Sequence, residues 1–355
     1  MMQGPKAAAL RRTLKQAAIR GGLETLSLAA RAGLSRRAAG RGVIFTLHHV
    51  RPREDKTFDP AAHLTVTPDF LDAAIAAVKR AGYRTVALSD LLRHLERPDD
   101  DRPVAAFTLD DGYRDNDVHA RPVFERHETP FTVFVTGGFV DRTHTIWWKT
   151  AEALIGRLDT FRFDFGEGEV ALPVRTLAEK YAAYDRLSRA LGLGPQDQIV
   201  ARLDAAAQAH GISPSAIVAA EVMDEAELRR LAATPFASLG AHTISHPILS
   251  RLDERRMREE ISASIDRVEA ITGTRPATFA YPYGTVAAVG PREYEAARQA
   301  GLSLAVTTQP DVLRCDSAAS PFSLKRVSLN GYYQKDRYVE TLLSGLPFAL
   351  RRARA

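Results

Sequence analysis

The sequence contains a single cysteine among 355 residues, Cys315, so the chain cannot form an internal disulfide. No stretch approaches the roughly 20 consecutive apolar residues that a membrane span requires. No glycine-rich phosphate loop is present, which argues against an unrelated nucleotide or phosphate enzyme. Arg20, Glu24 and Arg31 interrupt the apolar residues near the N-terminus, so no secretory signal peptide is predicted. We expect the protein to be cytoplasmic or peripheral to the cytoplasmic face of the membrane.

The positive charge is concentrated at the two ends of the chain. Residues 1–41 contain nine Lys and Arg residues against one acid, Glu24, and the last five residues add three arginines. The remaining body holds 36 bases and 42 acids and no basic stripe for nucleic acid. We predict that residues 1–41 form a basic helical or flexible arm, which either contacts an anionic membrane surface or is simply solvated. Residues 341–355 are predicted to form a basic C-terminal tail.

Short apolar segments alternate with helical patterns after Gly42, which indicates an α/β fold. Helices are expected at 68–81, 254–272 and 291–300. Repeated strand–helix units imply parallel strands joined by right-handed crossovers. We therefore predict a distorted (β/α) barrel of about seven parallel strands over residues 42–340. The expected strands are 43–47, 104–109, 131–135, 237–241, 278–281, 304–307 and 324–329.

This rhythm is interrupted between about residues 144 and 225. The pattern there is mostly helical, with one hairpin expected at 161–172. Because the alternation resumes directly afterwards, we interpret the region as a helical insertion on the barrel. It carries Trp147 and Trp148, which either stack on the faces of sugar rings or anchor the insertion to the barrel.

Two adjacent acids, Asp110 and Asp111, end the second predicted strand. The carboxyl ends of the strands form the active-site rim in (β/α) barrels, and Gly112 allows a sharp turn there. The alternative is that the acids cap the helix that follows, because Asp is a favoured N-cap residue.

Two histidines, His242 and His246, follow the strand at 237–241. They project from the same face if their segment forms a helical turn, which suits the binding of one metal ion. With one Asp they make a three-ligand site that keeps positions open for water and substrate. The second Asp is then available as a base.

A third segment, Phe279-Ala-Tyr-Pro-Tyr-Gly284, also lies at the end of a strand. A turn at Pro282, Tyr283 and Gly284 would present a backbone N–H and an aromatic ring to a sugar. The alternative is an ordinary loop.

Together these segments resemble the polysaccharide deacetylase family, which is also known as the NodB-homology domain or carbohydrate esterase family 4 and includes chitooligosaccharide deacetylases. Phe107–Gly112 resembles the TFDDG motif of the family, His242–His246 its H-[ST]-x-x-H motif, and Phe279–Gly284 its R-x-x-P-Y motif. The resemblance covers about residues 42–330.

The resemblance implies a role for each matching residue. Asp110 would be the general base, and the Tyr283 backbone N–H, beside Pro282, would help to stabilise the oxyanion. The ligands of a divalent cation, Zn²⁺ or alternatively Co²⁺ or Mn²⁺, would be Asp111, His242 and His246.

Two residues of the family pattern have no counterpart here. No arginine stands in Phe279–Gly284 to pair with the base, and the late strand reads Arg326-Val-Ser-Leu-Asn330, without the histidine that acts as general acid. We predict that Arg326 supplies the missing positive charge near Asp110. His48, at the end of the first strand, is a candidate acid, with a structural core histidine as the alternative.

The reaction that the resemblance implies is hydrolysis of a linear amide, the N-acetyl group of an N-acetylglucosamine-type oligo- or polysaccharide or glycolipid. The alternatives are the same scaffold acting on an O-acetyl ester, a formylated lipid-linked sugar or a cyclic amide, and a non-catalytic glycan- or metal-binding protein. The sequence predicts no oligomeric state.

Overall fold

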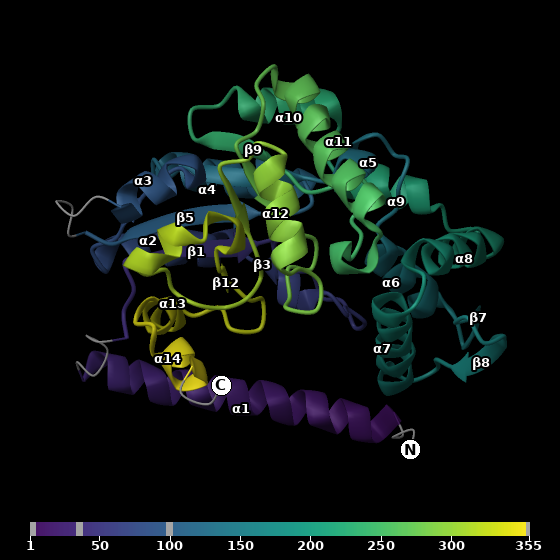
Figure 1. The fold of residues 1–355 in the computed structure, drawn as a ribbon. Coiled ribbons are helices and arrows are strands. Elements are labelled where there is room, and N and C mark those ends of the chain that lie inside the picture. Colours follow the sequence, from purple (N-terminus) through teal and green to yellow (C-terminus); the bar gives the residue numbers. More distant parts are fainter. Residues whose placement is uncertain (1–4, 33–37, 97–101, 353–355) are drawn as a thin grey trace.

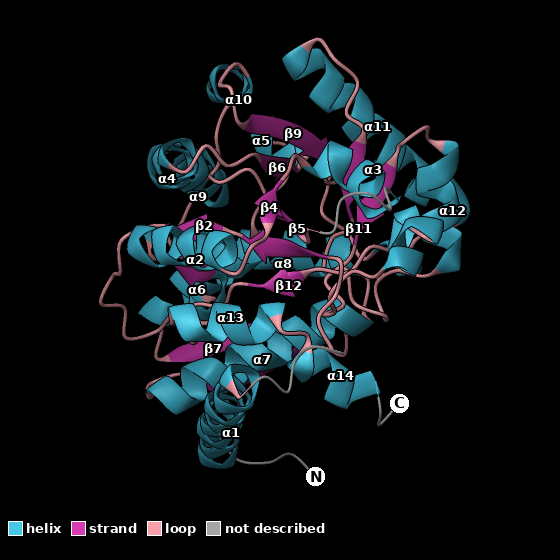
Figure 2. Cartoon of the chain, turned by 90° about the vertical axis from the view of Figure 1, so that its left-hand side faces the viewer, coloured by secondary structure: helices cyan, strands magenta, loops and turns pink. Residues whose placement is uncertain are grey.

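A curled parallel sheet surrounded by helices forms the centre of the molecule (Figures 1 and 2). The computed structural model describes residues 5–32, 38–96 and 102–352. The parts of the predicted arm and tail at 1–4, 33–37 and 353–355 lie outside the described residues.

The sheet has eight parallel strands. Seven follow the order β11-β10-β9-β6-β5-β1-β12, and β4 pairs with the first residues of β5. The strands are β1 (Gly42–Leu47), β4 (Arg84–Thr85), β5 (Val104–Leu109), β6 (Phe131–Val135), β9 (Ala237–Ala241), β10 (Thr278–Ala280), β11 (Leu304–Val306) and β12 (Val327–Ser328). The predicted distorted (β/α) barrel is confirmed. The sequence did not indicate β4, because two residues are too few to show an apolar pattern.

The two end strands are joined by the segment that precedes β12. Leu324 forms a parallel bridge with Val306; its N–H donates to the Ala305 carbonyl at 3.1 Å, and its carbonyl accepts from the Thr307 N–H at 2.8 Å. Val327 then pairs with β1. This crossing segment, residues 324–328, therefore runs from one edge of the sheet to the other and carries Arg326.

Strand alternation divides the apolar side chains between two faces of the sheet. Val43 and Phe45 belong to the large cluster beneath the outer helices, whereas Ile44 and Ala106 belong to a separate cluster. Successive residues of a strand point to opposite faces. By the same alternation, Asp110 continues the face of Ala106 and points into the barrel.

Three of the outer helices were predicted to within a residue at each end. They are α2 (Pro68–Arg80), α11 (Glu254–Thr272) and α12 (Pro291–Gln299). Thr67 caps α2 by accepting a hydrogen bond from the Phe70 N–H at 3.2 Å, and α11 ends at Gly273, whose φ of 73° only glycine adopts readily. The remaining short elements are β2 (His49–Val50), β3 (Thr65–Val66), α3 (Leu91–Glu96), α4 (Arg121–Arg126), α5 (Gly137–Val140) and α10 (Glu225–Ala232).

The region between β6 and β9 forms a group of helices with a hairpin at one side of the barrel (Figure 1). Its elements are α6 (Trp147–Arg157), β7 (Thr160–Asp164), β8 (Glu169–Pro173), α7 (Leu177–Leu193), α8 (Gln196–Ala209) and α9 (Pro214–Glu221). Phe161 pairs with Leu172 in the predicted hairpin. The apolar cluster of these helices also contains Tyr113 and Phe139, so it is continuous with the loops of the barrel.

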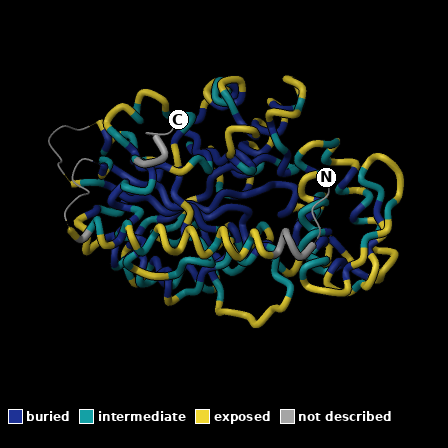
Figure 3. Tube along the Cα trace, turned by 90° about the horizontal axis from the view of Figure 1, so that it is seen from below, coloured by how far each residue is buried: buried dark blue, intermediate teal, exposed yellow. Residues whose placement is uncertain are grey.

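The long helix α1 (Pro5–Arg31) lies across the surface of the protein, against α7, α13 (Asp336–Leu343) and α14 (Leu346–Arg352) (Figures 1 and 3). Glu24 holds it to α13 by accepting hydrogen bonds from Lys335 Nζ at 3.0 Å, Arg337 Nη2 at 2.7 Å and the Tyr338 hydroxyl at 2.6 Å. In the described part of the chain, no helix combines the length and apolar character that crossing a membrane requires.

Replacing Glu24 by Ala should loosen α1, because it removes the acceptor shared by three donors. We expect hydrogen–deuterium exchange in residues 5–31 to become several-fold faster, with exchange in the central strands unchanged. Glu269→Ala, which removes an exposed partner of Arg275 on α11, is the matched control. Unchanged exchange in α1 would show that apolar contacts alone hold it in place.

Candidate active site

Asp110 and Arg326 form a buried ion pair at the mouth of the barrel. Arg326 Nη1 and Nη2 lie 2.7 Å from the two carboxylate oxygens of Asp110. The same guanidinium donates to Thr108 Oγ1 at 3.0 Å and to the Thr307 carbonyl at 2.9 Å. Burial alone would raise the pKa of Asp110, but the charge and hydrogen bonds of Arg326 outweigh it and hold that pKa well below its usual range.

Asp111 turns away from this pair toward the two histidines. Its φ of 74°, followed by a φ of 70° at Gly112, reverses the chain at the end of β5. Asp111 Oδ1 lies 3.6 Å from His242 Nε2 and 3.5 Å from His246 Nε2. Burial and the neighbouring Asp110 charge raise the pKa of Asp111 to about 8. The carboxylate therefore lacks the compensating charge that Arg326 gives its neighbour.

Asp111, His242 and His246 have the arrangement of a metal site. One ligand atom from each of the three lies within 4.8 Å of the others. Zinc bonds of 2.0–2.2 Å in a tetrahedron place ligand atoms about 3.3 Å apart, close to the 3.6 and 3.5 Å between Asp111 Oδ1 and the two histidines. His242 Nδ1 contacts the Ala280 carbonyl at 2.7 Å, so this nitrogen carries the ring proton. The lone pair of Nε2 is then free on the side that faces Asp111. Among the described residues Asp111 Oδ1 is buried without a hydrogen-bond partner. These residues fit a divalent cation.

The segment between the two histidines is a loop, and the expected helical turn is absent. Thr243 has a φ of 63° and His246 a φ of 56°, and left-handed residues cannot continue a right-handed helix. Glu260 of α11 holds the loop instead. One of its carboxylate oxygens accepts from the Ile244 N–H at 2.8 Å and the Ser245 N–H at 3.0 Å.

Gln196, at the start of α8, provides a second anchor for this loop. Its amide nitrogen donates to the His246 carbonyl at 3.1 Å and to the Tyr283 hydroxyl at 3.3 Å, and its oxygen accepts from the Ile248 N–H at 3.1 Å. Sequence reasoning identified neither anchor. An acid on the buried face of α11 was a signal for Glu260, whereas nothing near Gln196 indicated its position.

The two tryptophans begin α6 and pack between the rest of the insertion and the candidate metal site. Trp147 Nε1 donates to the Tyr283 hydroxyl and Trp148 Nε1 to the Tyr113 hydroxyl, both at 3.0 Å. The Trp148 ring centroid lies 5.1 Å from that of His246. Each tryptophan is 7% exposed, so both side chains are largely withdrawn from solvent.

The Pro-Tyr-Gly turn lies beside these two tryptophans. Pro282 is buried, and its carbonyl accepts from the Gly284 N–H at 2.7 Å. Tyr283 has a φ of 61°, and its backbone N–H has no acceptor among the described residues. Pro282 therefore shapes the turn, while Tyr283 contributes an unused donor.

Tyr113, which sequence reasoning missed, lies beneath Asp111. Its hydroxyl interacts with the Asp111 carboxylate, and its ring stacks on that of His49 with a centroid distance of 3.7 Å. Because it directly follows the Asp-Asp-Gly turn, it fixes the orientation of the carboxylate from within the same loop.

His48 approaches the ion pair from the end of β1. Its Nε2 lies 4.0 Å from Asp110 Oδ2, and its side chain is 21% exposed. Burial lowers the pKa of His48 to about 4, which makes the ring neutral at pH 7. A cavity of about 300 Å³ adjoins the metal site on the side of the insertion and is bordered by His246, Trp147 and Trp148.

Comparison with known proteins identifies a family and a shared fold. The model of the family described as polysaccharide deacetylase matches residues 97–170 and 194–305, more than half of the chain. The match includes both acids and both histidines and ends before Arg326. No curated protein matches the chain.

Solved structures of several deacetylases share the fold. The Streptococcus pyogenes deacetylase PplD in complex with acetate is 16% identical over 81% of this chain and 92% of its own, with a TM-score of 0.53. IcaB from Ammonifex degensii is 18% identical over 85% and 97% of the two chains, with a TM-score of 0.52. A Bacillus cereus polysaccharide deacetylase is 14% identical over 85% and 68%, with a TM-score of 0.51.

Replacing Glu260 by Ala should weaken metal binding, because the loop between the histidines loses its anchor. We expect the affinity for Zn²⁺ to fall by about 10–100-fold, measured by titration calorimetry on metal-free protein. Glu259→Ala, on the exposed side of the same helix, is the control. Unchanged affinity in a folded Glu260→Ala protein would show that the loop holds its shape without this carboxylate.

Proposed function

The chain belongs to the polysaccharide deacetylase family, and from this membership we propose that it is a metal-dependent hydrolase that removes N-acetyl groups from an N-acetylglucosamine-type oligo- or polysaccharide. The observation that carries the proposal is the contrast between two adjacent buried acids. Asp110 is paired with Arg326, whereas Asp111 faces His242 and His246. This contrast supports Asp110 as the base and Asp111 as the ligand.

Asp111, His242 and His246 would hold the cation. Two imidazoles and one carboxylate suit Zn²⁺, and also Co²⁺ or Mn²⁺. The bound cation supplies Lewis-acid polarisation of the amide carbonyl and makes a nearby water more acidic, which lets a weakly basic carboxylate accept the proton of that water.

Asp110 accepts the proton from the attacking water. Arg326 keeps the carboxylate ionised at neutral pH and fixes its plane through two hydrogen bonds of 2.7 Å. An ionised carboxylate has about four lone-pair positions, so two remain free for water after the arginine is bound. The pairing with Arg326 also makes Asp110 a weak base.

His48 moves the proton onward to the departing amine. The oxygen of water joins the acyl carbon, the C–N bond breaks, and the amine nitrogen takes the proton that Asp110 received. His48 Nε2 is 4.0 Å from Asp110 Oδ2, so a small shift brings it within hydrogen-bond distance of that carboxylate. A ring with a pKa of about 4 releases a proton to an amine readily.

Tyr283 and the two tryptophans position the substrate. The free backbone N–H of Tyr283 is available to the oxyanion that develops on the carbonyl oxygen. Trp147 and Trp148 are almost completely buried, and both border the cavity beside His246. We propose that the two tryptophans shape the acyl side of the site.

The proposal is tested with purified protein by measuring bound metal and acetate release from N-acetylated and O-acetylated glycans. Asp110→Asn should lower turnover by about 10²–10⁴-fold while the metal stays bound, because the substitution removes only the proton acceptor. His246→Ala should lose the metal. Wild-type rates in Asp110→Asn, or acetate release from esters alone, would refute the proposed reaction.

Removing the charge of Arg326 should shift the pH dependence of the enzyme. In Arg326→Met the burial of Asp110 is no longer opposed, so the pKa of Asp110 rises above its ordinary value. Asp110 works in its ionised form, so activity is present above this new pKa and is lost as the pH falls through it. The acidic limb of kcat/KM should therefore move to higher pH.

The same substitution should lower the free energy of unfolding at pH 7 by about 3–5 kcal/mol, because it leaves a buried charge unpaired. Arg326→Lys, which keeps one positive charge, should show a smaller shift in both measurements. An unchanged pH profile in a folded Arg326→Met protein would exclude Asp110 as the titrating base.

A further inference from the structure

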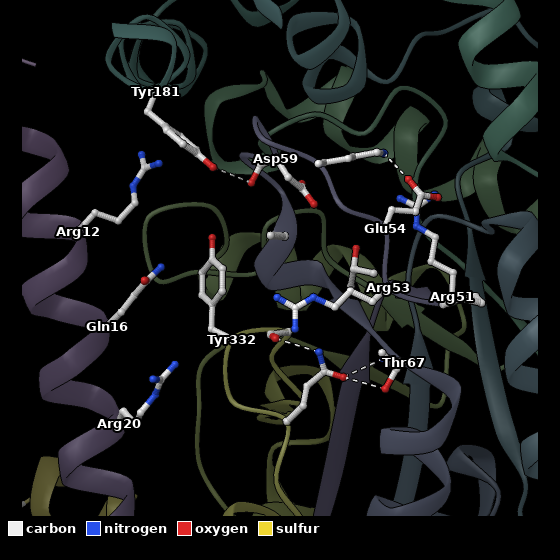
Figure 4. Close-up of a pocket in the computed structure, with 16 residues that line it drawn as sticks. Arg12, Gln16, Arg20, Arg51, Arg53, Glu54, Asp59, Thr67, Tyr181 and Tyr332 are labelled. Carbon is white, nitrogen blue, oxygen red and sulfur yellow. Dashed lines mark hydrogen bonds and ion pairs between the residues drawn. The ribbon is translucent and has the colours of Figure 1, made fainter. Parts of the chain in front are cut away.

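A second cavity, of about 480 Å³, lies between α1, the loop that follows β2 and the segment that follows β12 (Figure 4). Basic side chains dominate its lining. The bases are Arg12, Arg20, Arg51, Arg53 and Lys56, and the acids are Glu54 and Asp59.

Three of these bases already have partners. Arg12 Nη2 contacts Asp185 at 2.9 Å, Arg51 Nη1 contacts Glu221 at 3.3 Å, and Lys56 Nζ contacts Glu54 at 3.0 Å. They shape the cavity and add little free charge.

The remaining two, Arg20 and Arg53, are exposed and have neither an ion pair nor a hydrogen bond with any described residue. Arg20 projects from α1 along with Gln16, because residues four apart share one face of a helix. Arg53 reaches in from the opposite wall, next to Tyr332 (Figure 4). The cavity thus offers guanidinium, amide and hydroxyl donors from different directions.

Two segments of the cavity lining follow strands of the barrel. Arg51 follows His48 closely in the chain, and Gly331 follows the crossing segment that carries Arg326. The His63 carbonyl accepts from the Gly331 N–H at 2.9 Å, which holds the segment after β2 against the segment after β12. Because β1, β5 and β12 are parallel, these segments leave the barrel at the same end as Asp110, and a ligand held by Arg20 and Arg53 lies at that end.

We propose that this cavity binds a phosphoryl group carried by the substrate. Arginine recognises phosphate through paired hydrogen bonds, and the tetrahedral arrangement of phosphate oxygens suits donors placed on opposite walls. The Asp59 carboxylate, at the edge of the same cavity, is available to a sugar hydroxyl. The assignment rests on the proposed function, and it makes the substrate a phosphorylated, N-acetylated sugar.

Phosphate binding can be measured without turnover, so it is tested separately from deacetylation. Calorimetric titration with inorganic phosphate and with N-acetylglucosamine 1-phosphate should give saturable binding with a Kd of about 1 mM or tighter. The Arg20→Ala/Arg53→Ala protein should bind about tenfold more weakly or worse. Arg255→Ala/Arg298→Ala, which removes two exposed arginines elsewhere, should bind like the wild type.

Kinetics then connect the cavity to the substrate. The Arg20→Ala/Arg53→Ala protein should lose about tenfold in the ratio of kcat/KM for a phosphorylated N-acetylated sugar to that for its unphosphorylated form, mainly through KM. An unchanged ratio, or phosphate binding that is absent or independent of both arginines, overturns the assignment.

Vesicles distinguish a substrate phosphate from a membrane headgroup. If the protein binds phosphatidylglycerol vesicles through Arg20 and Arg53 but binds neither soluble phosphate, the cavity is a membrane contact and the substrate assignment is wrong. If no glycan is deacetylated while phosphate still binds through these arginines, the proposed reaction fails and the anion site stands.

Discussion

Two adjacent carboxylates buried at the end of one strand are the constraint on which the site depends. Ionised side by side in a low-dielectric interior, they would repel each other, and each would lose its hydration. Arg326 compensates Asp110, and the geometry around Asp111 leaves that acid to His242 and His246. The same strand end thereby provides two acids with opposite tendencies to hold a proton.

The geometry of the ligands depends on elements outside the strands. The His242–His246 loop contains two left-handed residues, so its shape is set by anchors and not by local preference. Glu260 reaches it from an outer helix and Gln196 from the insertion. Because Gln196 and Trp147 both contact Tyr283, the insertion also fixes the turn on the far side of the site. The insertion is therefore a structural part of the site.

The sequence predicted those features that repeat. Strand and helix periodicity located the barrel, and the polar residues after each strand located Asp110, Asp111, His242 and His246. Arg326 was predicted because the family pattern required a charge and its strand ended at the same rim. The helical turn was wrong, because nothing in the spacing of two histidines reveals the left-handed φ of Thr243. Gln196 acts through contacts between distant segments, which periodicity does not encode.

Asp110 and Arg326 are separated by 216 residues in the chain. During synthesis the N-terminal part emerges first, so Asp110 exists for a long interval without its counterion. Throughout that interval the inner face of β5 has to remain hydrated, since drying it would bury an unpaired charge. The crossing segment that closes the barrel is thus also the segment that brings Asp110 its counterion. A ribosome-bound chain that stops short of residue 326 holds Asp111, His242 and His246 but lacks the counterion of Asp110.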